Sequence, residues 1–493
     1  MGDKWIEVSL SEIAERIGDG LHGTPKYSEQ GKYHFINGNN LEDGVITIKE
    51  STKKVGFEQY KKHKKELNEN AILVSINGTI GNVALYNDEE IILGKSACYI
   101  NLKDNIHREF VAYVLTSFQF QEYIQRCATG STIKNVSLKM MREFAFRIPE
   151  DEVVQIDAVA TLKNIDLKIR LNRQTNQTLE QMAQALFKSW FVDFDPVFDN
   201  AFDAGLSVDY FPDELQHRAM LRQQHRSEAL QQGAEAMMPQ TPQSTAVLQP
   251  QNQQATQTES ERIRGLFPSE FEQCDDPNVG INGWIPKGWV ASSFESLINL
   301  IGGGTPKTSV DEFWGGEIPW FSVVDAPKDS DVFVIDTEKH ITQLGVDKSS
   351  TKLLRKGTTI ISARGTVGKC ALVGEPMAMN QSCYGINGLK GVSDEYIYFL
   401  TRYQVSDLQK RGHGSVFNTI TRETFKAINL AFCGTELTQQ FSYAIKPFLN
   451  KILLNNKQIV ELANTRDILL PKLISGEIQV NKDVTNEPLE KSV

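Results

Sequence analysis

The chain contains two copies of one domain-sized sequence pattern, about 284 residues apart. Trp5-Ile6 returns as Trp289-Val290, and Gly130-Ser131 returns as Gly414-Ser415. Between these ends the order of the matching residues is kept, with Gly23-Thr24-Pro25-Lys26 answered by Gly304-Thr305-Pro306-Lys307, Gly78-Thr79-Ile80-Gly81 by Gly365-Thr366-Val367-Gly368, and Cys98-Tyr99 by Cys383-Tyr384. A repeat of this length corresponds to whole domains and not to the short units of a solenoid. Two similar domains on one chain indicate a pseudo-symmetric molecule that meets two related sites.

Each copy is followed by a long segment with a helical pattern. Steps of three and four residues select a mostly apolar seam, which is typical of helices that pair as a coiled coil. The seam residues are Leu162, Ile165, Ile169, Asn172, Asn176, Leu179, Ala183, Leu186 and Trp190 in the first segment, and Ile445, Phe448, Ile452, Asn455, Ile459, Leu462, Arg466, Leu469 and Leu473 in the second. A helix over residues 152–190 would be roughly 58 Å long at ~1.5 Å per residue. The sequence therefore predicts a pair of long antiparallel helices that act as a rigid spacer.

Inside each copy the pattern is one of short apolar or β-branched strands separated by glycine turns. Strands are expected over residues 71–76, 83–86, 91–93 and 97–102, and over 359–362, 371–373 and 383–386 in the second copy. Helices are expected over 108–126 and 394–410. The predicted fold class is α+β, with two pseudo-symmetric mixed α/β domains separated by the long helices.

A change of composition marks the region between the copies. Residues from about 216 to 261 are rich in Gln, Thr, Ser and Pro and almost lack aromatic side chains, a composition that buries too little surface to fold alone. A helical start around Asp213 to Gln232 remains open. The expected organisation is a first domain over 1–150, a first helix over 151–192, a largely flexible linker over 193–283 that is acidic and then Gln-rich, a second domain over 284–434, a second helix over 435–475 and a flexible tail over 476–493.

Composition restricts the class of protein. The six cysteines form no C-x-x-C pair, which argues against a zinc ribbon and a disulfide framework. The start of the chain lacks an apolar signal segment, and no stretch reaches the ~18 apolar residues of a membrane span. We therefore expect a cytoplasmic protein that is not associated with a membrane.

The net charge of −10 argues at first sight against binding a polyanion. The basic residues, however, are concentrated in corresponding parts of the two copies. They are Lys49, Lys53, Lys54, Lys61, Lys62, Lys64 and Lys65 in the first copy, and Lys348, Lys352, Arg355, Lys356, Arg364 and Lys369 in the second. Either group alone is as often a solvated surface, but their matching places favour a shared surface that faces a polyanion.

Catalytic patterns are weak. The run from Ala363 to Cys370 resembles a phosphate-binding loop, but Ala363 replaces its first glycine and Cys370 replaces the Ser or Thr that would hold magnesium. Asp195-Pro196-Val197-Phe198 resembles the amide-binding motif of amino-methyltransferases but lacks its second proline, and no glycine-rich cofactor loop accompanies it. The eight histidines show no metal-ligand spacing. We therefore expect a chain that performs no chemistry and binds no metal.

The tandem domains, each followed by a long helix, resemble the DNA-specificity subunit of type I restriction-modification enzymes. The residues that carry the resemblance are Gly304-Thr305-Pro306, Ile318-Pro319-Trp320, the run from Ser362 to Gly368, Asn380-Gln381, and the run from Leu186 to Pro196. The resemblance covers essentially the whole chain except the Gln-rich segment. The first domain departs from the pattern at Gly94-Lys95-Ser96, where the second has Asn380-Gln381-Ser382, as expected if the two domains read different sequences.

The resemblance implies that the domains are target-recognition domains, each of which reads one half of a split asymmetric site in double-stranded DNA. The paired helices would set the gap between the halves. Two methyltransferase subunits would dock on the helices and bring S-adenosylmethionine, and motor-nuclease subunits would bring ATP hydrolysis and magnesium, so that this chain itself binds no cofactor. Two other functions remain open, a scaffold that pairs protein ligands without touching DNA and a nucleotide-binding enzyme.

Candidate DNA-binding residues follow from the loops and the basic stretches. Arg364 lies beside a Gly-Thr-Val-Gly turn and is the strongest candidate for contact with a base or a phosphate. Further candidates are Lys307, Lys369, Asn380 and Gln381 in the second domain, and Lys26, Asn77, Thr79 and Lys95 in the first. Lys61, Lys62, Lys64 and Lys65 are expected to contact phosphates. Asn172 and Asn455 occupy equivalent seam positions and are predicted to fix the register of the two helices, with exposure to solvent as the alternative.

Overall fold

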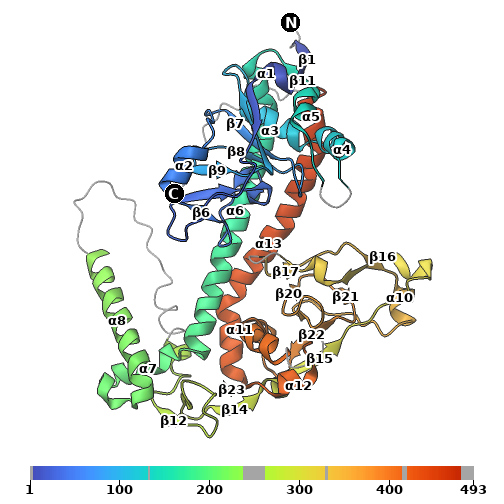
Figure 1. The fold of residues 1–493 in the computed structure, drawn as a ribbon. Coiled ribbons are helices and arrows are strands. Elements are labelled where there is room, and N and C mark those ends of the chain that lie inside the picture. Colours follow the sequence, from blue (N-terminus) through green and yellow to red (C-terminus); the bar gives the residue numbers. More distant parts are fainter. Residues whose placement is uncertain (1–3, 131–133, 237–260, 328–330, 413–418, 479–493) are drawn as a thin grey trace, which may run out of the picture. The chain divides into compact units, whose positions relative to one another are not determined.

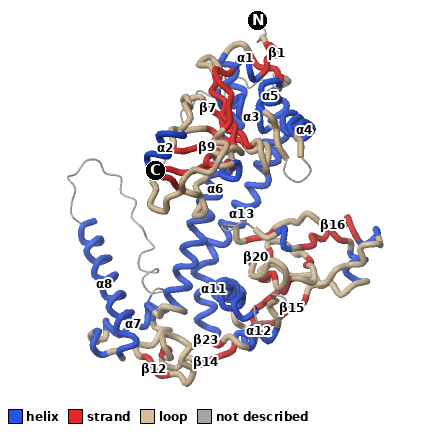
Figure 2. Tube along the Cα trace, in the orientation of Figure 1, coloured by secondary structure: helices blue, strands red, loops and turns tan. Residues whose placement is uncertain are grey.

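The computed structural model describes residues 4–130, 134–236, 261–327, 331–412 and 419–478. The chain divides into two compact units, the first formed by residues 1–170 with 460–493 and the second by residues 171–459. Each unit contains one stretch of each long helix and one mixed domain of strands and helices (Figures 1 and 2). The predicted α+β fold class is confirmed.

The first unit is built around a four-stranded antiparallel sheet with the order β2-β10-β7-β8. Smaller sheets pair β1 with β11, β4 with β5, and β3 with β6 and β9. Its strands are β1 Trp5–Ser9, β2 Ala14–Asp19, β3 Tyr33–Ile36, β4 Leu41–Glu42, β5 Val45–Ile46, β6 Lys54–Val55, β7 Ala71–Ser75, β8 Val83–Leu85, β9 Ile91–Leu93, β10 Ala97–Leu102 and β11 Ala145–Pro149. Its helices before the first long helix are α1 Leu10–Ile13, η1 Gly38–Asn40, α2 Phe57–His63, α3 Arg108–Thr116, α4 Phe118–Cys127 and α5 Leu138–Glu143.

The second unit repeats this plan. Its main sheet has the order β15-β22-β19-β20-β17, and a smaller one pairs β18, β16 and β21. Its strands are β12 Phe271–Gln273, β13 Trp284–Pro286, β14 Val290–Ser293, β15 Ile298–Gly302, β16 Trp314–Phe321, β17 Phe333–Val334, β18 His340–Ile341, β19 Thr359–Ser362, β20 Cys370–Val373, β21 Ala378–Met379, β22 Cys383–Gly388 and β23 Asn429–Phe432. Its shorter helices are α7 Asp195–Asp203, η2 Val208–Tyr210, α8 Asp213–Ala236, η3 Phe294–Leu297, η4 Asp311–Phe313, η5 Val323–Asp325, α10 Gln343–Asp347, α11 Asp394–Gly412 and α12 Arg422–Lys426.

The two long helices, α6 (Glu152–Phe191) and α13 (Thr435–Ile474), pack together and run antiparallel (Figure 1). Each has 40 residues, which corresponds to about 60 Å at ~1.5 Å per residue. All eighteen predicted seam residues are buried or half-buried. The seam also contributes to the cores of both domains, with Leu162 and Leu473 in the first unit and Ala183 and Ile445 in the second.

The end of each long helix packs on the first strand region of the other copy's domain. In the first unit, Gly476 follows α13 and lies so close to Trp5 that a Cβ added to the glycine would be 2.6 Å from the indole ring. In the second unit, Trp289 lies against Phe191 and Phe194 at the end of α6, with ring centroids 6.4 and 5.4 Å away. The aromatic run at the end of α6 is therefore part of the core of the second domain.

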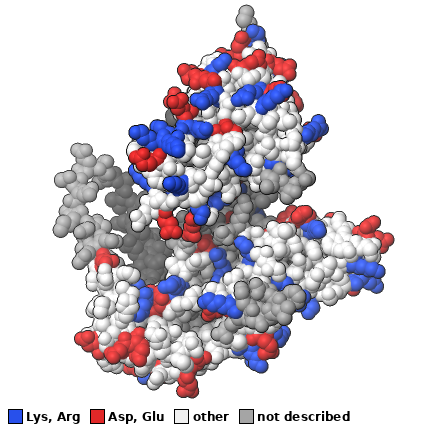
Figure 3. Space-filling model, viewed as in Figure 1, with Lys and Arg blue, Asp and Glu red and all other residues white. Residues whose placement is uncertain are grey.

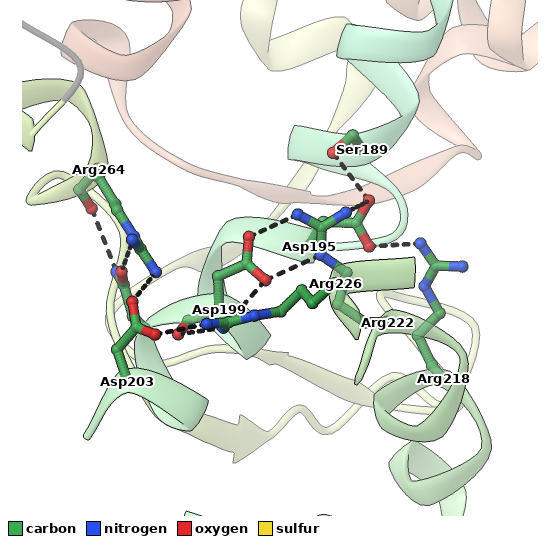
Figure 4. Close-up of polar contacts among 9 residues, drawn as sticks. Ser189, Asp195, Asp199, Asp203, Arg218, Arg222, Arg226 and Arg264 are labelled. Atoms are coloured by element: carbon green, nitrogen blue, oxygen red, sulfur yellow. Dashed lines mark hydrogen bonds and ion pairs between the residues drawn. The ribbon is translucent and has the colours of Figure 1, made fainter. Parts of the chain in front are cut away.

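The region between the copies corrects the expectation of a largely flexible linker over residues 193–283. Its acidic part forms α7, and α8 packs beside it through an ion-pair ladder that links Asp195, Asp199 and Asp203 to Arg218, Arg222, Arg226 and Arg264 (Figure 4). Arg218 also pairs with Asp193, which precedes α7. Phe198, Phe211 and Leu215 form a small apolar core between α7, α8 and the segment that joins them. The sequence does not reveal the ladder, because most of the arginine partners lie 23 residues further along the chain. The Gln-rich residues 237–260 lie outside the described residues, as do residues 479–493 of the predicted tail.

The helix expected over residues 108–126 is also corrected, because it is two helices. Ser117 separates α3 from α4 with an extended backbone (ψ 155°), and its hydroxyl donates to the carbonyl of Val114. The bend lets α4 turn its Phe120 and Ile124 into the core of the first domain. Both halves of the predicted helix are amphipathic, so the hydrophobic pattern did not reveal the break.

Candidate nucleic-acid interface

Three loops meet at one end of the strands of the main sheet in the first unit. We call this end of the sheet, where loops 20–26, 76–82 and 94–96 lie, its loop edge. The sheet register pairs Cys98 with Asp19 and Ala97 with Ser75, so the end of β2, the start of β10 and the end of β7 lie at the same edge. The loops at this edge are 20–26 after β2, 94–96 before β10 and 76–82 between β7 and β8. A backbone bridge between Leu21 and Gly94 joins the first two loops, and the amide of Ile76 donates to the carbonyl of Ser96 at 2.9 Å to join the third.

The second unit brings the equivalent loops together in the same way. Gly302 pairs with Tyr384, and Ser362 pairs with Cys383. The loops 303–307, 380–382 and 363–369 therefore meet at the corresponding edge. The amide of Ala363 donates to the carbonyl of Ser382 at 2.7 Å, which matches the bond between Ile76 and Ser96 in the first unit.

The loop between the two central hairpin strands has the same internal construction in both units. The strand before it ends in a buried serine, Ser75 or Ser362, whose hydroxyl accepts the amide of Asn82 at 2.8 Å or of Lys369 at 2.9 Å. Two glycines with positive φ follow in each copy, Gly78 and Gly81 in the first and Gly365 and Gly368 in the second. Side chains in such a left-handed conformation are strained, so glycine is required at these turns. Between the glycines, Thr79 and Thr366 are exposed, whereas Ile80 and Val367 pack toward the cores of their domains.

Nine of the predicted DNA-binding residues lie on these two edges. Lys26, Thr79 and Lys95 are exposed and Asn77 is half-buried in the first unit, where its side-chain amide donates to Asn135 at 3.1 Å. The other five belong to the second unit, in which Lys307, Arg364, Lys369 and Gln381 are exposed and Asn380 is half-buried. Side chains far apart in the sequence are thus gathered within each unit on a solvent-facing loop cluster.

Some residues that support these side chains were not predicted from the sequence. The hydroxyl of Thr305 donates to the side-chain oxygen of Gln381, which orients the glutamine amide. In the first unit Ser96 bridges the backbone amide of Gly38 and the side chain of Asn37 at 2.9 and 3.0 Å. The repeat of Thr24 as Thr305 is the sequence signal for the first of these. The second had no signal, because Asn37 reaches the edge from a different sheet.

The four lysines expected to contact phosphates lie on and directly after α2. Lys61, Lys62 and Lys64 are exposed and Lys65 is half-buried, and no ion pair involves any of the four within the described residues. Figure 3 shows Lys and Arg side chains gathered over α2. The group adjoins the loop edge, because the amide of Lys26 donates to Gln59 of α2 at 3.2 Å. Lys64 also lies 5.8 Å from the ring of Tyr60, which is stacked on Tyr33.

The two basic stretches are less alike than their sequence positions suggest. Lys49 pairs with Glu42 at 2.6 Å and Arg355 pairs with Asp394 at 2.7 Å, so each stretch contains a cation whose charge is locally compensated. The second stretch is spread along loops, with Ser350 and Thr351 packed against Gly304 at the loop edge. In the first stretch, by contrast, Lys61, Lys62, Lys64 and Lys65 lie together on and directly after α2.

The geometry argues against the two catalytic resemblances. The loop from Ala363 to Cys370 connects the antiparallel strands β19 and β20, whereas a phosphate-binding loop leads from a strand into a helix. Asp195 begins α7 and pairs with Arg218, so its carboxylate belongs to the ion-pair ladder. Burial raises the pKa of Cys370 and Cys383 to about 12, which keeps both thiols protonated at neutral pH.

Within the described residues, no group of three or more His, Cys, Asp or Glu side chains is arranged to hold a metal ion. No helix in the same part of the chain is both long and apolar enough to cross a membrane.

The seam asparagines form a buried amide cluster in the second unit. Asn172 and Asn455 are 3% and 1% exposed, which removes the alternative that both face solvent. They do not hydrogen-bond to each other. The side-chain amide of Asn172 donates to Gln458 at 2.8 Å, and that of Asn455 donates to Asn176 at 2.8 Å. Asn176 in turn donates to Asn456 at 2.5 Å, so the cluster is wider than the predicted pair.

Comparison with known proteins places both copies in one family. The family model for the type I restriction modification DNA specificity domain matches residues 2–181 and 286–464. The chain is 30% identical over 380 residues to the type I restriction enzyme HindI specificity subunit of Haemophilus influenzae, covering 75% of this chain and 77% of that protein. It is 28% identical over 236 residues to the MjaIX specificity subunit of Methanocaldococcus jannaschii, covering 47% of this chain and 53% of that one. The crystal structure of an S subunit from M. genitalium has a similar fold, with a TM-score of 0.51, 15% identity and 96% of each chain covered.

Proposed function

Because the chain belongs to the type I restriction modification DNA specificity family, we propose that it reads the two halves of a split, asymmetric site in double-stranded DNA. Its relatives are named specificity subunits, so the chain is the specificity component of such a system and not a catalytic subunit. The first domain would read one half-site and the second domain the other.

The observation that carries the proposal is the repeated loop edge. In both units the same three loops meet, and they present polar and cationic side chains of different identity at equivalent positions. Lys95 in the first unit corresponds to Gln381 in the second, and Asn77 corresponds to Arg364. Side chains of these types hydrogen-bond to base edges in the major groove or to phosphates. Two copies of one loop arrangement that carry different side chains at equivalent positions suit a DNA site whose two halves differ in sequence.

The basic group on α2 would supply affinity that does not depend on sequence. Four lysines without ion pairs in the described residues release counterions when they approach phosphates, which strengthens binding and makes it sensitive to salt. This group adjoins the loop edge through the hydrogen bond between Lys26 and Gln59. Phosphate contacts there would position the first domain while the loop edge reads bases.

The helices α6 and α13 would set the distance between the half-sites. A helix of 40 residues corresponds to about 60 Å, which is of the order of one to two turns of DNA at ~34 Å per turn. Asn172 and Asn455 would keep the helices in one register, because a shifted register would leave their buried amides unpaired.

Partner subunits would dock on the long helices. Leu171 of α6 and Leu454 of α13 occupy equivalent positions, outside the seam, and are 52% and 60% exposed. Exposed leucines at matching sites on two pseudo-symmetric helices suit two copies of one partner. We propose that these partners are two methyltransferase subunits that carry S-adenosylmethionine, and that motor-nuclease subunits add ATP hydrolysis and magnesium. Such a complex would act in the cytoplasm.

The scaffold alternative differs in its target. A chain that only paired protein ligands would have no need for two loop edges with cationic and amide side chains next to a lysine group. The nucleotide-binding alternative is disfavoured by the hairpin geometry of the loop from Ala363 to Cys370. Stoichiometric ATP binding by the isolated chain would favour that alternative.

Methylome sequencing of a host with and without this gene tests the proposal. The expected result is a split motif with two unlike halves and a fixed gap, methylated only when the gene is present. A binding assay of the chain with its methyltransferase subunits on a duplex that carries the motif provides the second measurement. Absence of a gene-dependent motif, together with failure to bind any duplex, would leave the protein scaffold as the better explanation.

A further inference from the structure

A glutamine braces the central hairpin loop from behind in both units. In the first unit the side-chain amide of Gln121, on α4, donates to the carbonyl of Gly81 at 2.9 Å. In the second unit the side-chain amide of Gln409, on α11, donates to the carbonyl of Val367 at 2.8 Å. The two glutamines come from equivalent helical regions, and each bonds a carbonyl at the end of its loop.

The glutamines occupy the space that the second loop glycine leaves free. A Cβ added to Gly81 would overlap the side-chain oxygen of Gln121, and one added to Gly368 would be 2.7 Å from the side-chain nitrogen of Gln409. Both glycines have positive φ, 95° and 92°. Each loop therefore combines a left-handed turn with a close approach to a side-chain amide, and the same combination recurs in two domains that differ at their exposed readers.

The first half of each loop is already held by backbone bonds on both sides. In the second unit, Ala363 donates to Ser382 at 2.7 Å and accepts from Ile420 at 2.9 Å. The corresponding bonds of Ile76 to Ser96 and Val136 are 2.9 and 2.8 Å in the first unit. The second half of each loop, which leads back into the sheet, accepts the hydrogen bond from the glutamine side chain. The exposed residues Arg364 and Thr366 lie between the backbone bonds of Ala363 and the bond from Gln409 to Val367. The Gln409 bond therefore helps to fix the direction in which their side chains project.

We propose that Gln121 and Gln409 are positioning residues that hold the reading loops in the conformation needed to discriminate bases, each for its own half-site. The proposal rests on the proposed DNA-reading function and adds residues that do not themselves touch DNA. A loop that has lost the bond to its glutamine keeps its exposed side chains, but these side chains then adopt several orientations. Discrimination then falls more than affinity, because phosphate contacts made elsewhere are unchanged.

Each glutamine bonds directly to its own loop, and the two can be tested in parallel. Gln121 also donates to the carbonyl of Leu115 at 2.8 Å, so it additionally secures the junction between α3 and α4. The side-chain amide of Gln409 bonds directly to the reading loop through the carbonyl of Val367. Substitution of Gln409 tests the second half-site, and substitution of Gln121 is the equivalent experiment for the first.

The experiment replaces Gln409 by Met, which keeps the length of the side chain and removes the donor. The variant is produced in complex with the methyltransferase subunits, and the methylome of a host that expresses it is compared with that of the wild type. One neutral hydrogen bond contributes about 0.5–1.5 kcal/mol, so we expect a roughly 2- to 10-fold loss of discrimination at one or more bases of one half-site. The other half-site and the gap should be unchanged. Gln121→Met should relax the opposite half-site.

Controls separate positioning from general stability. Gln404→Met changes another half-buried glutamine of α11 and should leave the motif intact. Gln409→Glu removes the donor by a different route and should reproduce the half-site effect if Gln409→Met folds poorly. Thermal unfolding of each complex reports stability. An unchanged motif in both Gln409 variants, or equal relaxation of both half-sites that follows the loss of thermal stability, would overturn the inference. Absence of any split motif in the wild type would instead overturn the proposed function.

Discussion

The side-chain amide of Asn455 donates to the side-chain oxygen of Asn176 at 2.8 Å, and both residues are at most 1% exposed. This bond joins the two long helices at a point where an apolar seam would otherwise continue. Within the described residues the oxygen of Asn455 has no partner of its own. The cluster thus has a cost in stability, which is the behaviour expected of polar residues that select one register over others.

Substitution at this bond should separate stability from register. Asn455→Leu alone should destabilise the chain by about 1–3 kcal/mol, because Asn176 is left buried with an unpaired oxygen. Asn176→Leu with Asn455→Leu should recover only part of that loss, because the Asn456 oxygen loses its donor, and methylation should then tolerate more than one gap between half-sites. Thermal unfolding and methylome sequencing measure the two effects. A double variant as unstable as the single one, with an unchanged gap, would contradict the prediction. The same comparison for Asn172→Leu tests the bond to Gln458.

Arg364 should contribute directly to recognition by the second domain. If its guanidinium contacts a base, Arg364→Ala should cost about 1–3 kcal/mol in binding and relax one position of the motif. If it contacts a phosphate, binding should weaken about evenly across sequences. Titration of matched and mismatched duplexes distinguishes the two. Unchanged affinity and an unchanged salt dependence would show that Arg364 does not touch DNA.

Neutralising the lysines of α2 should reduce the electrostatic part of binding. Replacing Lys61, Lys62, Lys64 and Lys65 by Gln should flatten the dependence of log affinity on log salt by about 0.9 for each phosphate that is no longer neutralised, without changing the motif. Lys4→Gln with Lys139→Gln is the control, since both lysines are exposed and paired with a carboxylate. A changed motif in the fourfold variant would mean that these lysines read bases.

The ion-pair ladder should decide whether α8 stays docked on α7. The Arg222 guanidinium donates to both oxygens of Asp199, at 2.9 and 2.5 Å, and its side chain is 26% exposed. Arg222→Met should therefore increase amide hydrogen exchange along α8 and α7. The difference between the variant and the wild type should be larger at low salt than at high salt, because salt screens the ion pairs of the wild type. Gln223→Ala, on the exposed side of the same helix, is the control. Equal protection in both variants would show that the small apolar core under the ladder is sufficient.

His107 should make the stability of the first domain depend on pH. Burial lowers the pKa of His107 below its usual 6.5, although the neighbouring Glu109 carboxylate opposes the shift. A base whose folded pKa is depressed contributes stability that is present above its ordinary pKa and is lost as pH falls through the folded value. The melting temperature of the wild type should thus fall more than that of His107→Gln between pH 7.5 and pH 5.5. Parallel curves for the two proteins would exclude this contribution.

The sequence by itself determined the architecture of this protein. The repeat predicted two similar domains. The apolar seam predicted that each long helix is paired, because the periodicity that allows pairing is visible within the sequence of a single helix. All seven expected strands are present, as β7, β8, β9, β10, β19, β20 and β22, since apolar runs between glycine turns are local signals. The other strands of the two domains were not predicted. The resemblance to specificity subunits pointed to a family that the comparisons confirm.

The tertiary structure decided what the local pattern could not carry. The register of β10 against β2 and β7 brings Lys95 and Asn77 to one edge, and no spacing along the chain expresses that register. Asp199 became part of a folded helix pair because Arg222, 23 positions further along the chain, lies within hydrogen-bonding distance of it. Gln121 and Gln409 were invisible in the sequence, since a glutamine on a helix is ordinarily a solvated side chain. Their role depends on which backbone carbonyl lies close to the side-chain amide, and only the folded chain sets that distance.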